Sequence, residues 1–169
     1  MQGITMNALA HSKNSTILLL LTALSLTTIT ASASQNLPFR LGDEGTITFN
    51  GTTATTAGTG NATHLGRITS EGNLLIVGQP SCTNNELGFS VQMQDAFTAA
   101  NGDRLTTAIT MQLCPIAPGI YHGVGTYVVT GGTGRFANAT GSGMFDGTGN
   151  FNTGTIICAL NGTISIHQE

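Results

Sequence analysis

Residues 123–143, GVGTYVVTGGTGRFANATGSG, hold the pattern that decides the fold of this chain. A β-prone segment leads into a corner rich in glycine, and a second β-prone segment follows it. Glycine adopts positive φ without a steric penalty, so a tight turn is predicted here. The glycines of this corner are Gly131, Gly132 and Gly134. We expect Phe136 to pack from the turn into the core.

The spacing of these glycines also fits a dinucleotide-binding loop. Gly132, Gly134 and Ala137 match the G-x-G-x-x-A pattern, which holds a pyrophosphate only where it joins a strand to a helix N-terminus. Residues 138–141, NATG, are poor helix formers. We therefore predict a structural turn and no cofactor, with the Arg135 guanidinium fixing the corner by donating to backbone carbonyls.

Strands are predicted wherever apolar and polar residues alternate. The clearest pair, residues 87–94 and 105–114, flanks Asn101-Gly102, a dipeptide that strongly favours a β-hairpin. Further strands are predicted at residues 46–53, 62–69, 73–77, 125–130, 143–151 and 154–166. Gly162 is expected to mark a bulge or bend in the last of these. Seven or eight short strands with glycine turns predict an all-β fold, either a barrel or a sandwich.

Residues 1–33 have the order of parts that is typical of a signal peptide. His11 and Lys13 precede an apolar run at residues 17–26, and small residues end at Ala-Ser-Ala, residues 31–33. The run is shorter than the roughly 20 apolar residues that a membrane span needs. We expect cleavage, no membrane span in the mature chain, and a secreted or periplasmic location; a retained anchor is the alternative.

The rest of the chain has the length of a single domain. We expect residues 34–44 to form a flexible N-terminal segment and residues 45–169 to form the domain. Only 8% of residues are charged, and no lysine follows Lys13. Because a nucleic-acid-binding surface needs a clustered basic face, nucleic acid is excluded as a partner.

Three segments together resemble small secreted bacterial proteins with an allene oxide cyclase-like barrel: THLGR at residues 63–67, FTAANGDRL at 97–105, and TGGTGRFANATGSG at 130–143. The GGTGRF element also resembles a corner of plant dirigent proteins. The resemblance implies a single eight-stranded antiparallel β-barrel, often trimeric in the plant relatives. In those relatives the barrel binds an apolar small molecule and steers a ring closure or a radical coupling. Their working residues line the lumen, outside the corner motif, and cannot be matched to positions in this chain.

The predicted hairpin places Cys114 opposite Gly88, at the end where the loop carrying Cys82 enters. A Cys82–Cys114 disulfide is therefore sterically allowed, and an oxidising compartment favours it. Three free thiols are the alternative. Cys158 shares a strand face with apolar residues, so we expect a buried and inert thiol.

Few polar residues point to chemistry. His64 is the better ligand-binding candidate, because the predicted strand at residues 62–69 would turn its face toward a barrel lumen, and Tyr127 is the second. No zinc spacing is present, so no metal is expected. The carboxylates are scattered along the sequence, and no catalytic residue is assigned.

Barrels of about eight strands either fill with side chains or hold one small ligand. The leading hypothesis is thus a barrel that binds a small, mostly apolar ligand. The alternative is a filled barrel that forms homo-oligomers or decorates the cell surface through its threonine-rich strands, and an enzyme of the cyclase or dirigent type comes third. A lumen below about 300 Å³, the lower end of ligand-pocket volumes, argues against the first.

Overall fold

A computed structural model of the chain describes residues 35–83 and 85–166. The predicted signal peptide, residues 1–33, lies outside these described residues. The described strands are β1 (Gln35–Asn50), β2 (Thr53–Ala62), β3 (Gly66–Gly78), β4 (Phe89–Ala99), β5 (Arg104–Ala117), β6 (Ile120–Gly132), β7 (Thr140–Asn150) and β8 (Thr155–Ile166). One 3₁₀ turn, η1 (Gly134–Phe136), joins β6 to β7. No helix in the described part of the chain is long and apolar enough to cross a membrane.

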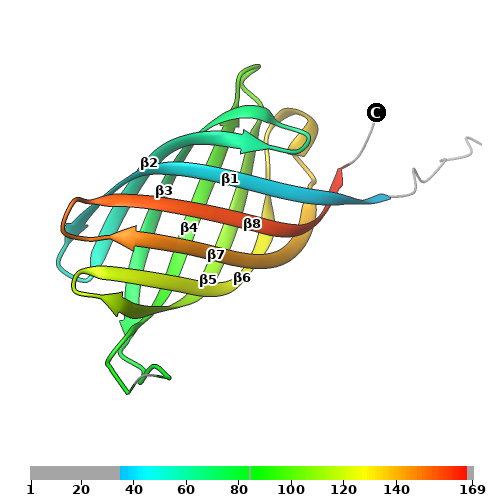
Figure 1. The fold of residues 1–169 in the computed structure, drawn as a ribbon. Coiled ribbons are helices and arrows are strands. Elements are labelled where there is room, and N and C mark those ends of the chain that lie inside the picture. The colour runs from blue at the N-terminus through cyan, green and yellow to red at the C-terminus, as the bar shows by residue number, and fades with distance from the viewer. Residues whose placement is uncertain (1–34, 84, 167–169) are drawn as a thin grey trace, which may run out of the picture. The chain divides into compact units, whose positions relative to one another are not determined.

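The eight strands form one closed antiparallel barrel (Figure 1). Each strand pairs with the next in sequence, and β1 pairs with β8 to close the sheet. The prediction of an eight-stranded antiparallel barrel is confirmed, and the sandwich is excluded. Closure leaves no sheet edge open to pair with another chain.

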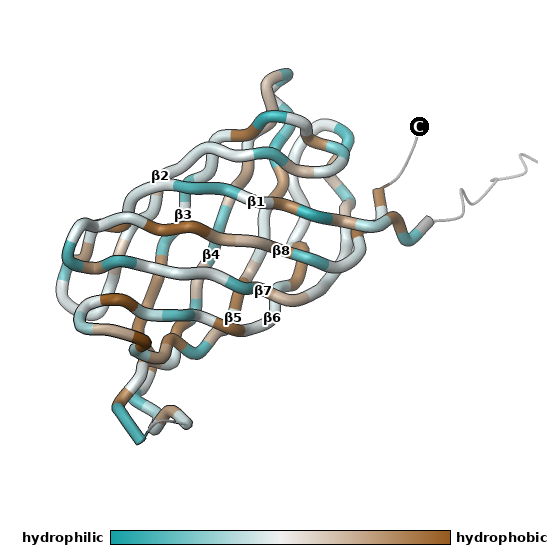
Figure 2. The backbone as a smooth tube through the Cα atoms, viewed as in Figure 1, coloured by the Kyte–Doolittle hydropathy of each residue, from teal (hydrophilic) through white to brown (hydrophobic). Residues whose placement is uncertain are grey.

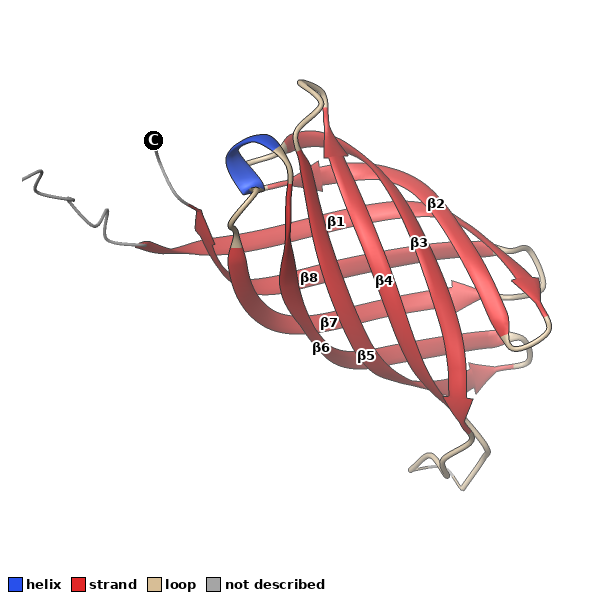
Figure 3. Ribbon diagram, turned by 180° about the vertical axis from the view of Figure 1, so that it is seen from behind, coloured by secondary structure: helices blue, strands red, loops and turns tan. Residues whose placement is uncertain are grey.

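Consecutive hairpins place the turns alternately at the two ends of the barrel. The β1–β2, β3–β4, β5–β6 and β7–β8 connections share one end, which we call the mouth. The β2–β3 turn, the β4–β5 turn and η1 share the other, which we call the closed end. Figure 3 shows η1 and the long β3–β4 loop at these opposite ends.

Two sequence predictions at the N-terminal side are wrong. Residues 35–44, expected to be flexible, belong to β1 and pair with β8 and, from Leu41 onward, also with β2. Of the strand predicted at residues 62–69, residues 63–65 form a turn, and residues 66–69 join the strand predicted at 73–77 in one strand, β3; the preceding Thr- and Gly-rich segment is β2. That segment turns only small residues inward, so it lacks the alternation of large apolar and polar residues that marks a strand.

The glycine corner forms the predicted turn. Phe136 is 0% exposed, and its ring packs into the core. Arg135 pairs with the Asp103 carboxylate, its Nε lying 3.1 Å from Oδ2, and its guanidinium lies over the Phe136 ring; it does not fix the corner through backbone carbonyls as predicted. Gly134 has a φ of 56°, and a side chain at this position would collide with that same carboxylate.

The inward residues of the closed half are large and apolar. They include Phe39, Phe97, Leu105, Phe136 and Ile164. The bulge predicted at Gly162 is absent, because β8 keeps its register with β1 and β7 through this residue. Instead Gly143 and Gly162, paired across β7 and β8, leave room for the ring of Tyr127.

Most strands alternate in hydropathy from one residue to the next, as Figure 2 shows. Exceptions are β3, with an apolar run at residues 74–77, and β8, which carries a continuous hydrophobic run in that view. The inward residues of β8 are mostly apolar, and so is the exposed outward residue Ile157.

Candidate functional site

The mouth of the barrel holds an apolar pocket of about 510 Å³, which we call the mouth cup. Its apolar side chains come from the mouth-end portions of five strands and from the β7–β8 turn. They are Phe49, Leu74, Ile76, Phe89, Leu113, Tyr121 and Phe151. This volume lies within the range of ligand-binding pockets, about 300 to 1,000 Å³.

Four aromatic rings form a continuous chain around the cup. The Phe151 ring lies 4.7 Å from the ring of Phe49, edge on, and 4.7 Å from that of Tyr121, stacked. Phe89 lies 5.5 Å from Tyr121. The sequence has seven Phe and two Tyr, so nearly half of its aromatic residues meet here. Such pairs stabilise an arrangement by about 0.5–1.5 kcal/mol each beyond simple burial, which keeps the cup preformed.

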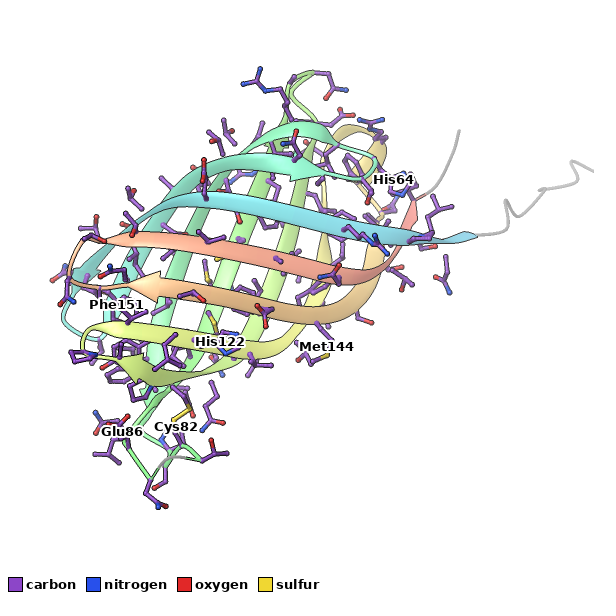
Figure 4. The ribbon with its side chains drawn as sticks, viewed as in Figure 1. His64, Cys82, Glu86, His122, Met144 and Phe151 are labelled. Carbon is purple, nitrogen blue, oxygen red and sulfur yellow. A yellow bond between two sulfur atoms is a disulfide. The ribbon has the colours of Figure 1, made fainter. Side chains whose placement is uncertain are left out.

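The loop between β3 and β4 is tied to the rim of the cup. The disulfide between Cys82 and Cys114 is present, with the Cα atoms 5.8 Å apart, so its prediction is confirmed. Gly88 precedes Phe89, the partner of Leu113 in the β4–β5 register, and a Cβ atom at Gly88 would lie 2.6 Å from the Cys82 sulfur and 3.4 Å from the Cys114 sulfur. The glycine therefore makes the crosslink possible. Figure 4 shows Cys82 in this loop, at the same end of the barrel as Phe151.

Below the cup, side chains nearly fill the lumen. The remaining cavity has a volume of about 40 Å³ and is lined mainly by Ile47, Met93, Met111, Phe145 and Ile156. This is far below the roughly 300 Å³ that an enclosed ligand site needs. The interior on its own therefore argues against a ligand held in the lumen, and the space for one lies at the mouth.

A group of polar side chains points inward at the middle of the barrel, between the closed half and this cavity. We call it the polar cluster: Asp43, Ser70, Asp95, Thr107 and Cys158. The Ser70 hydroxyl donates to Asp43 Oδ2 over a distance of 2.6 Å. Cys158 is paired with Asp43 across β8 and β1, and Thr107 with Asp95 across β5 and β4.

Burial controls the ionisation of this cluster. It raises the pKa of Asp43, although the hydrogen bond from Ser70 acts in the opposite direction. Burial, with a smaller contribution from the charge of Asp43, raises the pKa of Asp95 to about 7. Burial and then the two carboxylates raise the pKa of Cys158 to about 12. The thiol is thus protonated and unreactive at neutral pH, because the thiolate is the reactive form.

Neither predicted ligand-binding residue lies at the cup. His64 is in the β2–β3 turn at the closed end, with a φ of 67° and its Nε2 3.1 Å from the Pro38 carbonyl oxygen (Figure 4). The prediction that a strand turns it toward the lumen is wrong, since β2 ends at Ala62. Tyr127 does point inward, but it is 1% exposed and packs against Phe39. Burial raises the pKa of this phenol.

No set of three or more metal-ligating side chains comes together within residues 35–83 and 85–166. His122 lies on the outer face of β6, with Nε2 3.1 Å from Oδ2 of Asp146 on β7.

Sequence reasoning missed the aromatic residues of the cup and the two inward-facing aspartates, Asp43 and Asp95. Strict alternation along β4, from Phe89 through Val91 and Met93, would have placed Asp95 on the inner face.

No protein-family model matches the chain, and no curated protein or solved structure is significantly similar to it. The resemblance to allene oxide cyclase-like and dirigent barrels therefore stays a prediction. Function has to be argued from the geometry of the barrel.

Proposed function

We propose that this protein binds a small, mostly apolar molecule in the mouth cup, after export to an oxidising compartment. The observation that carries the proposal is the cup itself, about 510 Å³ of space walled by four contacting aromatic rings. Phe49 at its edge is 38% exposed, so an apolar ligand would remove aromatic surface from water. Each Å² of apolar area covered contributes roughly 25 cal/mol.

The disulfide at the rim of the cup supports the same proposal. Affinity improves when a site is ordered before the ligand arrives, because less conformational entropy is lost on binding. Here the Cys82–Cys114 disulfide joins the β3–β4 loop to β5 beside the cup. The same bond supports export, since disulfides persist in oxidising compartments.

A fluorescence titration with the neutral apolar dye N-phenyl-1-naphthylamine tests the proposal, because the fluorescence of this dye increases in apolar surroundings. We expect saturable binding to the purified protein. Thr52 lies on the rim of the cup and is exposed, so Thr52→Trp should block the site without touching the core. Phe151→Ala removes one ring of the cup wall and should weaken binding about tenfold. Met144→Ala, on the outer face of β7, is the control. Equal binding by all four proteins would count against the cup.

A second candidate function is self-association of a filled barrel. Val124 and Val128 on β6 flank Met144 on β7, and all three side chains are about half exposed on the outer face. Exposed apolar side chains that cluster are typical of interaction sites. Native mass spectrometry should then show an oligomer that Met144→Lys dissociates; a monomer at all concentrations would exclude it. A cyclase- or dirigent-type activity stays the third proposal, carried by the resemblance alone.

A further inference from the structure

The polar cluster holds two carboxylates without a protein cation beside them. Among the described residues, Arg40 and Arg67 are exposed, Arg104 pairs with Glu71 outside the barrel, and Arg135 pairs with Asp103 at the corner. Burying a carboxylate without a partner is unfavourable, and such groups either bind a cation or become protonated. Within the described barrel, no cationic side chain therefore pairs with Asp43 or Asp95.

A second observation points to a missing ligand at the same place. Thr107 is 1% exposed, and its hydroxyl has no hydrogen-bond partner. It faces inward directly opposite Asp95 in the β4–β5 ladder. A buried hydroxyl without a partner destabilises a fold by roughly 1–3 kcal/mol, so such groups normally have a role.

The small cavity below the cup leads to these groups. Its polar lining residues are Thr56, Thr148 and Cys158. Thr56 Oγ1 and Asp95 Oδ1 both lie in the space that a side chain at Gly72 would occupy, so the two oxygens are close neighbours. Cys158 is the cross-strand partner of Asp43. The cavity thus ends against the polar cluster.

The cavity also adjoins the cup, since Leu74, Leu113 and Phe151 line both. Met93 and Met111 line the passage. Methionine side chains are unbranched and adapt to irregular shapes, so they can make way for a slender group. The volume of about 40 Å³ exceeds the share of about 30 Å³ that one water takes in the liquid, and a primary ammonium group is of similar size.

We propose that the ligand of the mouth cup is an apolar primary amine, whose ammonium group passes Met93 and Met111 and binds against Asp95. This inference rests on the proposed function and narrows its ligand class. A primary ammonium group has three N–H donors. The acceptors there are the Thr56 hydroxyl, which lines the cavity, and beside it the Asp95 carboxylate with its cross-strand partner Thr107, while the apolar body stays between the aromatic rings.

Binding of the amine must depend on pH. The titratable groups that interact with Asp95 are Asp43 from β1 and Cys158 from β8; β3 and β5 contribute Ser70 and Thr107, which do not titrate in this range. The ammonium ion favours ionised Asp95, so its affinity should rise with pH. Since the pKa of Asp95 is about 7, we expect about a tenfold loss of affinity for each pH unit below that value.

Isothermal titration calorimetry of the purified protein tests this with three ligands of one chain length: n-hexylamine, n-hexanol and n-hexyltrimethylammonium. At pH 8 we expect n-hexylamine to bind at least tenfold more tightly than n-hexanol. The quaternary head is too large for the cavity, so n-hexyltrimethylammonium should gain nothing over the alcohol. Asp95→Asn should remove the preference for the amine and its pH dependence, whereas the matched surface variant Asp146→Asn should keep both.

The outcomes separate the two proposals. If amine and alcohol bind equally, or if the quaternary amine binds as tightly as the primary one, this inference is overturned and the apolar cup stands. If none of the three ligands binds, the proposed function fails and the inference with it. Should Asp95→Asn not fold, the isosteric Thr107→Val, which leaves the carboxylate in place, must weaken the amine more than the alcohol.

Discussion

The Asp95 carboxylate occupies the space that a side chain at Gly72, its cross-strand neighbour on β3, would fill. A β-carbon at Gly72 would also lie 2.6 Å from Thr56 Oγ1 and 2.9 Å from the terminal methyl carbon of Met93. A position without a side chain on β3 thus makes a carboxylate possible inside the barrel. The glycines of this protein create interior volume as well as turns.

Gly72→Ala should therefore destabilise the barrel. The added methyl must displace a carboxylate, a hydroxyl and a methionine, and overpacking of this kind destabilises a fold by about 1–3 kcal/mol. Urea denaturation measures the effect. Gly42→Ala on β1 is the matched control, because nothing lies within 4 Å of its β-carbon, and it should change stability by less than about 0.5 kcal/mol. Equal effects at the two positions would show that Gly72 is not tightly packed.

The ionisation of Asp95 should make stability fall as pH rises. Its pKa is raised from 3.8 to about 7 in the folded protein, so between these values the folded state holds a proton that the unfolded state has lost. Each unit of the shift corresponds to about 1.4 kcal/mol. Wild type should thus lose stability relative to Asp95→Asn from about pH 4 to pH 7, and little beyond. Urea denaturation of both proteins at pH 4.5, 6 and 7.5 measures this loss. If the difference in free energy of unfolding between the two proteins is the same at all three pH values, the raised pKa of Asp95 is contradicted.

Much of the fold could be predicted from the sequence because large residues alternate along most strands. The hairpin at Asn101-Gly102, the turn at Gly134 and the Cys82–Cys114 bond all follow from local patterns or from one register. Strand β2 could not be predicted in the same way, because its inward positions are small: Ala54, Thr56, Gly58, Gly60 and Ala62. Periodicity detects contrast in size and polarity, and this strand has little of either.

The site was harder to predict than the fold. The cup joins Phe49, Phe89, Tyr121 and Phe151, which come from four different hairpins and meet only when the barrel closes. No spacing in the sequence links them. Asp95 differs, because alternation alone places it on the inner face; its isolation among apolar inward residues was a usable signal that sequence reasoning overlooked.

The glycine corner gives a third prediction. Gly134→Ala introduces a side chain at a φ of 56° and also pushes against the Asp103 carboxylate. Gly66→Ala carries only the first penalty, since its φ is 73° and nothing lies within 4 Å. In urea denaturation, we expect Gly66→Ala to lower the free energy of unfolding by about 1 kcal/mol. Gly134→Ala should lower it by about 1 kcal/mol more. The extra loss should disappear in an Asp103→Ala background, and its persistence there would point to another contact.

The Cys158 thiol should not react with alkylating agents in the folded protein. Its pKa of about 12 leaves almost no thiolate at pH 8, and the side chain points into the barrel. Iodoacetamide should therefore add no carbamidomethyl group to the native protein within an hour. It should add one after unfolding without reductant, because the other two cysteines are bonded. Mass spectrometry counts the adducts, and rapid native labelling would show that the interior is open to solvent.

The Cys82–Cys114 disulfide should stabilise both the fold and the cup. The bond closes a loop of 32 residues, and the chain-entropy model assigns about 3–4 kcal/mol to a loop of that length. A Cys82→Ser, Cys114→Ser double variant should lose about that much in urea denaturation. It should also bind N-phenyl-1-naphthylamine more weakly, because ordering the freed β3–β4 loop then opposes binding. Dithiothreitol should reproduce both effects in wild type and neither in the variant. If stability falls while dye affinity is unchanged, the loop holds the barrel together without shaping the cup.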